Sequence, residues 1–491
     1  MIAAISWVPK GVSKSVPAAA DPPSKDEIEE ILKSGVLGIR EETESEENDE
    51  TMSVDAVQQD DELARALSAA NALGKCSKSS KGDADSLTDA LDELDMDNYD
   101  NEDDGVELFG PGVANLYYPS NTMDPFLSNK DDDDSEEEED IIIKPDDAVL
   151  VCARNEDDVS HLEVWIMEED STNGYSNMYV HHDIVIPAFP LCTAWLDCPL
   201  KGGDKGNFIA VGSMDPAIEI WDLDIMDEVL PSATLGGIIE KKKKGKKKFV
   251  KYKDGSHIDA VLGLAWNKEY RNILASASAD KLVKIWDMAT ETCNLTLENH
   301  TDKVQAVAWN HFAHQVILSG SFDRSVVMKD GRSPSHSGFR WPVAADVECL
   351  AWDPHTEHSF VVSLENGEVV GFDIRNASSD VSSQPKPSFT IHAHDKAVCT
   401  IAYNSLVPNL LATGSMDKMV KLWDLSNQPS CVASKNPKAG AVFCISFSED
   451  SPFTLAIGGS KGKLQVWDLL PEAEVTRRYG KYANQAKLST S

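Results

Sequence analysis

The chain has 491 residues, 26% of them charged, and a formal net charge of −38. This length allows a domain of about 300 residues plus a large additional segment. Residues 13–146 hold 39 Asp and Glu against 10 Lys and Arg, a net of −29, which leaves −9 for the rest. The acidity therefore belongs to one segment, and the remainder has the charge of an ordinary globular domain.

Other features of the composition exclude several classes of protein. The nine cysteines are scattered and form no Cys-x-x-Cys pair, so neither a disulfide framework nor a zinc site is indicated. No apolar run approaches the ~18 residues that span a bilayer. The apolar N-terminus lacks the charged region that opens a signal peptide. We therefore expect a soluble intracellular protein with no cofactor.

A short apolar string that ends in an aromatic residue opens each unit of an internal repeat. An Ala or Ser precedes each aromatic, and from residue 266 onward the aromatics are spaced by 43, 43, 51 and 44 residues. Strings of this kind are typical of buried strands. They are, in chain order, Ile2–Trp7, Leu191–Trp195, Leu262–Trp266, Val304–Trp309, Val347–Trp352, Val398–Tyr403 and Val442–Phe447.

The acidic segment, residues 13–146, follows the first string. It is rich in Asp, Glu, Ser and Gly and cannot bury enough apolar surface to offset chain entropy, so we predict that most of it is disordered. A capping box at Ser24–Glu27 and the spacing in Asp61–Leu73 predict short helices. These are either incidental structure in a tether or docking elements that fold on partners. Ser45 and Ser135 precede glutamates and are candidate phosphorylation sites.

A second string closes each unit and usually ends in Trp-Asp. Its copies are Leu162–Met167 with Trp165, Ile218–Asp222 with Trp221, Val283–Asp287 with Trp286, Val326–Asp330 with Lys329, Val369–Asp373 with Phe372, Val420–Asp424 with Trp423, and Leu464–Asp468 with Trp467. Small-residue strands such as Leu274–Asp280 lie between the two strings, and Ala148–Ala153 is that strand of the first unit. Met178–Ile184 is expected to connect the first unit to the second.

The closing Trp-Asp and the spacing of about 43 residues between the aromatics resemble WD repeats. In such proteins each repeat forms one four-stranded blade of a propeller. The sequence thus predicts an all-β, seven-bladed WD40 β-propeller with a long acidic disordered insertion in the first blade. Residues 1–12 hold the first strand of blade one and close the ring, 13–146 are the insertion, 147–470 form the propeller, and 471–491 are a C-terminal tail.

Polar residues recur at fixed offsets from the aromatics. His257, His300 and His394 each precede a first-string aromatic by nine residues. Asp215, Asp280, Asp323 and Asp417 each precede the closing position by six. The WD resemblance implies that this His and Asp hydrogen-bond through a Ser or Thr to the closing Trp. A catalytic or metal-binding role is the alternative, but recurrence in successive blades favours the structural role.

A lysine-rich loop, residues 231–256, stretches the second repeat. Its lysines, Lys241, Lys242, Lys243, Lys244, Lys246, Lys247 and Lys248, predict a nuclear localisation signal or a nucleic-acid contact, the alternative being a solvated loop. Lysine attracts phosphate without reading bases. The loop precedes a first strand, whereas the acidic insertion follows one, so we expect them on opposite faces.

The arrangement resembles the periodic tryptophan protein 1 family, on residues 5–8, 143–147, 179–183, 218–225 and 274–280, together with the acidic insertion and the lysine loop. Departures from the repeat pattern are Lys329 for a closing Trp, Lys461 for a turn Asp, and Val343 and Lys438 where repeat histidines would stand. The resemblance implies a nucleolar or nuclear factor in ribosome biogenesis, linked to ribosomal RNA production, large-subunit maturation and chromatin.

We therefore expect a non-enzymatic scaffold whose partners are proteins of pre-ribosomal particles, with histones, chromatin or ribosomal RNA as further candidates. A histone- or chromatin-binding transcriptional adaptor is the alternative. No phosphate loop, nucleophile elbow or positioned pair of carboxylates supports an enzyme. The repeat pattern names neither the binding partner nor the face that binds it.

Overall fold

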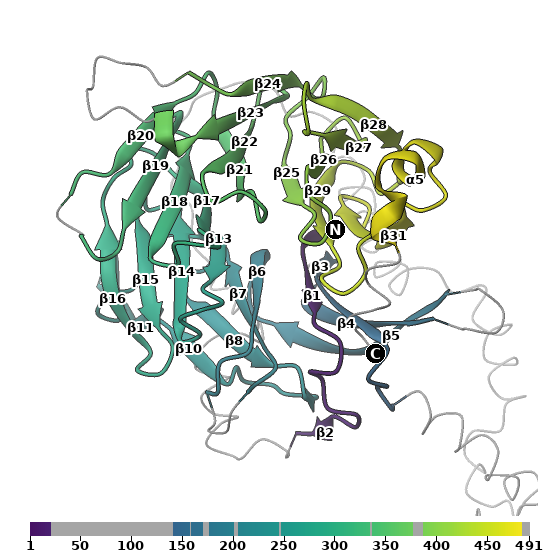
Figure 1. Cartoon of the computed structure of the whole chain (residues 1–491). Coiled ribbons are helices and arrows are strands. Elements are labelled where there is room, and N and C mark those ends of the chain that lie inside the picture. Colours follow the sequence, from purple (N-terminus) through teal and green to yellow (C-terminus); the bar gives the residue numbers. More distant parts are fainter. Residues whose placement is uncertain are drawn as a thin grey trace, which may run out of the picture. The chain divides into compact units, whose positions relative to one another are not determined.

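The computed structural model describes residues 1–20, 141–157, 159–169, 176–200, 205–244, 247–333, 336–376 and 386–483. Within them the protein forms a ring of seven antiparallel β-sheets, so the predicted seven-bladed propeller is confirmed (Figure 1). The predicted helices at Ser24–Glu27 and Asp61–Leu73, and the serines Ser45 and Ser135, lie outside the described residues.

The first three blades contain four strands each, in the order inner to outer. Blade 1 consists of β1 (Ile2–Val8), β3 (Ala148–Glu156), β4 (Val159–Glu169) and β5 (Ser176–Ile186). Blade 2 consists of β6 (Pro190–Leu196), β7 (Phe208–Ser213), β8 (Ile218–Asp222) and β10 (Ala233–Leu235). Blade 3 consists of β13 (Val261–Trp266), β14 (Ile273–Ser278), β15 (Val283–Asp287) and β16 (Thr292–Leu297).

The remaining blades follow the same order, and the last has three strands. Blade 4 consists of β17 (Val304–Trp309), β18 (Val316–Ser321), β19 (Ser325–Asp330) and β20 (Phe339–Pro342). Blade 5 consists of β21 (Val347–Trp352), β22 (Ser359–Leu364), β23 (Glu368–Asp373) and β24 (Phe389–His392). Blade 6 consists of β25 (Thr400–Tyr403), β26 (Leu410–Gly414), β27 (Val420–Asp424) and β28 (Ser430–Lys435). Blade 7 consists of β29 (Val442–Phe447), β30 (Thr454–Gly459) and β31 (Gln465–Asp468).

The second strand of each blade is buried on both faces between neighbouring blades. All six residues of β7 are buried, and the last five of β18 are too. Small residues are needed there because the next blade approaches closely. A Cβ at Gly320 would lie 2.5 Å from Val347 of the following blade. The outermost strand β16, by contrast, alternates between exposed and partly buried residues, as a half-solvated strand does.

The N-terminal strand β1 closes the ring, as predicted from the string that ends in Trp7. It pairs with β3, Trp7 opposite Leu150, although about 140 residues of sequence separate them. On its other side β1 packs against β29, where Figure 1 shows the purple strand beside the last blade. A Cβ at Gly458 would lie 2.6 Å from Ile2, so Ile2 takes the place that Val347 takes beside Gly320.

The propeller has two distinct faces because its inner strands share one direction. We call the face that carries the loops after the inner strands the insertion face; the acidic insertion leaves from it after Val8. We call the opposite face, where His257, His300 and His394 precede the inner strands, the tetrad face. The connection between β10 and β13, which contains the lysine run, lies there. The antiparallel order therefore places the two ends of the acidic insertion and the connection with the lysine run at opposite faces.

Both ends of the acidic insertion, expected over residues 13–146, are held on the insertion face. Strand β2 (Ala18–Ala19) pairs in parallel with β9 (Ile225–Met226) of blade 2. The returning chain buries Ile143, whose backbone N–H donates to Ser15 O at 2.9 Å. His181 Nε2 lies 2.9 Å from Ile141 O. Apolar packing and backbone hydrogen bonds thus fix residues 13–20 and 141–146.

Three other expectations differ from the structure. Met178–Ile184 is part of β5, the outer strand of blade 1, and not a connection. Residues 471–483 are not a free tail: helix α5 (Ala473–Tyr479) buries Val475 and Tyr479 in the apolar cluster of blades 6 and 7. Its Arg478 donates to Asp424 at 2.7 Å. The lysine-rich loop contains strands, described below. No helix in the described ranges is long and apolar enough to cross a membrane.

Candidate functional site

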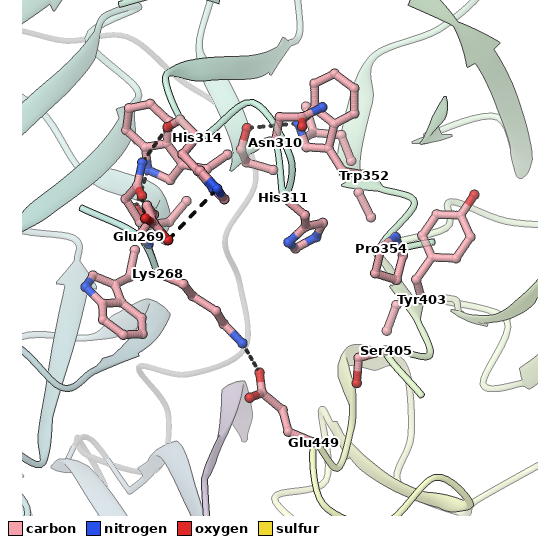
Figure 2. Close-up of a pocket in the computed structure, with 18 of the residues that line it drawn as sticks. Lys268, Glu269, Asn310, His311, His314, Trp352, Pro354, Tyr403, Ser405 and Glu449 are labelled. Atoms are coloured by element: carbon pink, nitrogen blue, oxygen red, sulfur yellow. Dashed lines mark hydrogen bonds and ion pairs between the residues drawn. The ribbon is translucent and has the colours of Figure 1, made fainter. Parts of the chain in front are cut away.

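The mouth of the central channel on the insertion face forms a cavity of about 490 Å³. Its wall is built from the ends of the inner strands, and blades 3 to 7 each contribute one aromatic: Trp266, Trp309, Trp352, Tyr403 and Phe447. The loops that follow add His311, Pro354 and Ser405, as Figure 2 shows. The cavity therefore derives directly from the repeat.

Polar side chains at this mouth are engaged with one another. Lys268 of blade 3 forms an ion pair with Glu449 of blade 7 across the channel (Figure 2). Both side chains are well exposed, so the pair contributes little to stability. His314 Nε2 lies 4.0 Å from Glu269. The described part of the chain contains no group of three His, Cys, Asp or Glu that could hold a metal ion.

An asparagine that follows the inner-strand aromatic donates a side-chain hydrogen bond to the backbone of the next blade. We call these contacts the asparagine clasps, and sequence patterns did not predict them. Asn267 Nδ2 donates to His314 O at 2.6 Å, and Asn310 Nδ2 donates to Glu357 O at 3.2 Å. Asn404 Nδ2 likewise donates to Pro452 O at 2.6 Å. The signal was present, because each Asn directly follows Trp266, Trp309 or Tyr403. These contacts stiffen the mouth rather than supply chemistry.

On the tetrad face, blade 3 contains a complete chain of four polar groups. Trp286 Nε1 donates to Ser276 Oγ at 2.8 Å, and Ser276 Oγ lies 2.7 Å from His257 Nε2. His257 Nδ1 lies 2.8 Å from Asp280 Oδ2. Every member finds a partner when the serine hydroxyl donates to a neutral imidazole whose Nδ1–H donates to the carboxylate.

Blade 6 repeats this chain and blade 4 contains part of it. His394 lies 2.8 Å from both Asp417 and Thr413, which accepts a hydrogen bond from Trp423 at 3.0 Å. In blade 4, His300 lies 3.0 Å from Asp323 and 2.8 Å from Ser319. Lys329 stands at the closing position there, and it donates to His336 O instead. The chain in blade 4 therefore has three members.

Burial fixes the charge states of these chains. Burial lowers the pKa of His257 and His394, and this outweighs the opposing effect of Asp280 and Asp417. Burial also tends to raise the pKa of Asp280, but hydrogen bonds from His257 and backbone amides outweigh it and the pKa falls. Near neutral pH His257 and His394 are therefore neutral and Asp280 is charged, as the hydrogen-bond chain requires.

The other predicted blade positions have different surroundings. Asp215 is exposed, and its backbone N–H donates to Ser213 Oγ at 3.1 Å. Trp221 donates to Glu219 at 3.2 Å, as Trp165 donates to Glu163 at 2.9 Å. Trp467 is buried, with Lys435 Nζ 4.9 Å from its ring centre. Blades 1, 2 and 7 thus hold their closing tryptophans by other means.

The lysine run forms a hairpin, not an irregular loop. Strand β11 (Ile238–Lys244) pairs with β12 (Lys247–Tyr252), with Lys242 opposite Phe249 and Lys244 opposite Lys247. Lys246 lies outside the described residues. We call residues 238–252 the lysine hairpin. The second strand also contains Phe249, Val250 and Tyr252, and aromatic and β-branched residues favour strands.

The base of the lysine hairpin is attached to blade 3. The turn that precedes it uses Gly236 and Gly237 at φ of 70° and 97°, which favour glycine. Gly237 N–H donates to the buried Ser256 Oγ at 2.8 Å, and Ser256 donates to His257 O at 2.7 Å. The hairpin is therefore anchored beside the polar chain of blade 3.

The ring of blades and the repeated Trp–Ser–His–Asp chain define a WD-repeat β-propeller. The family described as WD domain, G-beta repeat matches residues 250–287, 291–328, 385–424 and 429–468. A WD repeat-containing protein of Schizosaccharomyces pombe is 41% identical over 360 residues, 71% of this chain and 67% of that protein. Periodic tryptophan protein 1 of Saccharomyces cerevisiae is 32% identical over 349 residues, 62% of this chain and 60% of the relative.

The Drosophila melanogaster homolog of periodic tryptophan protein 1 is 28% identical over 314 residues, 63% of this chain and 64% of the fly protein. The chain belongs to the periodic tryptophan protein 1 family of WD-repeat proteins. The matches span between 60% and 67% of these relatives' own lengths. None of these matches is to an enzyme family.

Proposed function

We propose that this propeller is a non-enzymatic scaffold in ribosome biogenesis, acting in ribosomal RNA transcription or processing and in large-subunit maturation. Its partners are proteins of pre-ribosomal particles, and its location is the nucleus, chiefly the nucleolus. Association with chromatin is part of this proposal. Phosphorylation of Ser45 and Ser135 would add to the charge of the acidic insertion.

One observation carries the proposal: a single ring bears a lysine hairpin at one face and an insertion of net charge −29 at the other. A polyanion such as RNA is attracted to the first, and basic proteins to the second. One molecule can then join both kinds of component, as assembly of a ribonucleoprotein requires.

The discriminating experiment is affinity purification of the full chain from nuclear extract, with and without nuclease treatment. The proposal expects pre-ribosomal proteins and ribosomal RNA precursors, and a defect in ribosomal RNA processing after depletion. Recovery of nucleosomes without pre-ribosomal proteins, with processing intact, would overturn it. That result would favour the second candidate, a chromatin-binding adaptor whose acidic insertion holds histones.

The role of the lysine hairpin has its own test. Replacing the seven lysines between 241 and 248 by glutamine should abolish nuclear accumulation, whereas replacing them by arginine, which keeps the charge, should preserve it. Unchanged accumulation of the glutamine variant would show that the run is not the sole import signal.

A further inference from the structure

Four exposed lysines follow one another around the tetrad face of blades 6 and 7. They are Lys396, Lys418, Lys438 and Lys461, and we call them the basic arc. Two of them occupy positions where blade 7 departs from the repeat: Lys438 stands where a repeat histidine would, and Lys461 where the turn aspartate would. Blade 7 thus replaces a buried polar chain by two exposed cations.

Backbone contacts place these lysines in one continuous stretch. Ser415 Oγ donates to Lys396 O at 3.3 Å, and Lys418 N–H donates to Ser415 O at 3.1 Å. Val442 N–H donates to the same carbonyl at 3.1 Å, which joins the Lys418 turn to the loop after Lys438. Lys461 N–H donates to Ala439 O at 3.0 Å. The arc is therefore built on rigid turns.

In blades 3 and 4 the basic side chain at the turn contacts the next blade, whereas the basic side chains of the arc make no such contact. Lys281 and Arg324 occupy the turn position of Lys418, and each reaches the next blade, Lys281 donating to Thr301 O at 2.8 Å and Arg324 to Asp346 at 3.1 Å. For the side chains of Lys418, Lys438 and Lys461, the described residues supply neither an ion pair nor a hydrogen bond.

Two of the arc lysines also hold a costly backbone conformation. Lys418 has φ of 72° and Lys438 has φ of 59°, in the left-handed region where glycine is favoured. Lys281 and Arg324 share this conformation in blades 3 and 4, so at Lys418 it belongs to the repeated turn. What distinguishes Lys418 is that its side chain, unlike theirs, reaches no partner among the described residues. Exposed carboxylates near the arc include Asp395 and Glu365, and Asp417 is engaged with His394.

The chemistry of the arc fits a polymer of phosphates better than a peptide. Its cations are lysines spread over two blades, so they present separated point charges and no pocket around one residue. Among the described residues, the exposed Tyr and Phe side chains, Tyr270 and Phe312, lie in loops of the insertion face, so they supply the arc with no phenyl ring on which an unpaired base could stack. A double helix presents phosphates without free bases.

We infer that the basic arc binds the phosphate backbone of double-helical RNA, without reading sequence. This inference rests on the proposed function for the choice of RNA. The lysine hairpin lies on the same face, and the acidic insertion leaves the opposite face, which would repel the same ligand. The propeller would therefore present its tetrad face to the helix.

The test compares two triple variants of the full chain that remove the same charge. The arc variant is K418Q/K438Q/K461Q, and the control is K205Q/K386Q/K481Q, whose lysines are exposed on the insertion face or the rim. Binding of a short RNA duplex of mixed sequence is measured between about 0.05 and 0.2 M salt. Each lost lysine–phosphate contact should weaken binding about fivefold near 0.15 M salt. It should also reduce the slope of log affinity against log salt concentration by about 0.9.

The arc variant should therefore bind roughly 100-fold more weakly, with a slope lower by about 2.7, and the control should match the wild type. Equal weakening in both variants, or none in the arc variant, overturns the inference. Tighter binding to a DNA duplex than to RNA overturns the choice of RNA. Binding of poly-glutamate to the arc, at charge concentrations too low for the duplex to bind, would assign the arc to an acidic peptide instead.

A second pair of variants separates binding from folding. K418G and K438G relieve the left-handed backbone, so the melting temperature should stay the same or rise while duplex binding falls. A fall in melting temperature with unchanged binding would give these lysines a structural role and overturn the inference. If duplex binding depends on the arc but this protein is absent from pre-ribosomal particles, the proposed function is refuted and the inference about the arc stands.

Discussion

The indole of Trp7 donates a hydrogen bond to the carbonyl of Ser446 at 3.0 Å, across 439 positions of sequence. The same contact joins other neighbouring blades: Trp309 donates to Ala265 O at 3.1 Å, and Trp352 to Ala308 O at 3.3 Å. The junction of blade 7 with blade 1 is therefore equivalent to the junctions of blade 3 with blade 4 and of blade 4 with blade 5. The ring is closed by an ordinary blade contact, made by the first strand of the chain.

Trp7→Ala should destabilise the propeller by about 3–5 kcal/mol, because it removes a buried indole and leaves a cavity at this junction. Trp7→Phe should cost less, since it keeps most of the packing and removes chiefly the hydrogen bond, about 1 kcal/mol. Chemical denaturation of the full chain measures both. Removing Met1–Val8 should lower the melting temperature further, and an unchanged value would contradict the role of β1.

Ser276→Ala should cost about 1 kcal/mol more than Ser319→Ala. Ser276 serves both Trp286 and His257, whereas Ser319 serves His300 in a blade whose closing position is Lys329. The first substitution therefore leaves two buried groups unsatisfied and the second leaves one. Urea midpoints at neutral pH compare them. Equal destabilisation would show that the indole contributes nothing to the chain.

Replacing residues 21–140 by a flexible Gly-Ser linker of about ten residues should leave the fold intact. Its ends are already held by the Ser15–Ile143 hydrogen bond and by the pairing of β2 with β9. Shortening the loop should even stabilise the propeller, by about 2 kcal/mol of closure entropy. Thermal unfolding checks this, and a large fall in stability would show that the insertion contributes to the core.

Glu219→Gln should stabilise the propeller above pH 7 and have little effect below pH 4.5. Burial raises the pKa of Glu219 to about 7, against the hydrogen bond from Trp221, which lowers it. Between the unfolded value of 4.5 and about 7 the folded state holds the extra proton, so stability falls as pH rises through this window. Because the side chain is only partly buried, we expect a gain on the order of 1–2 kcal/mol at pH 8.

Glu163→Gln is the matched control, because Glu163 also accepts from the closing tryptophan of its blade. It additionally forms an ion pair with Arg154 at 2.8 Å. Removing that charge should destabilise the protein at pH 8, by about 1–3 kcal/mol. Stability curves from pH 5 to 9 for both variants would show opposite signs, and the same sign in both would contradict the assignment.

Inner and second strands could be predicted from the sequence because they pack between neighbouring blades. Most of their residues are therefore apolar or small, and this leaves strings that recur, down to Ile2–Trp7 at the start of the chain. The outer strands are harder to predict. β5 and β16 are half-solvated, many residue types fit them, and the prediction of a connection at Met178–Ile184 was wrong.

The candidate sites were predicted unevenly for the same reason. His257, Asp280 and Trp286 lie at fixed offsets because one buried chain must be satisfied in each blade that has it. The lysine hairpin, the asparagine clasps and the basic arc depend on contacts between blades. Lys438 and Lys461 were visible as departures from the repeat, but only the turns of blades 6 and 7 bring them beside Lys418.

The sequence by itself determined the number of blades, the chain order of their strands and the place of the acidic insertion. Each follows from local patterns of burial, which one strand imposes on its own residues. The tertiary structure alone decided that Trp7 meets Ser446, that residues 15 and 143 meet at the base of the insertion, and that four lysines form one arc. Such contacts join residues far apart in the chain, and no local pattern encodes which distant residue lies opposite.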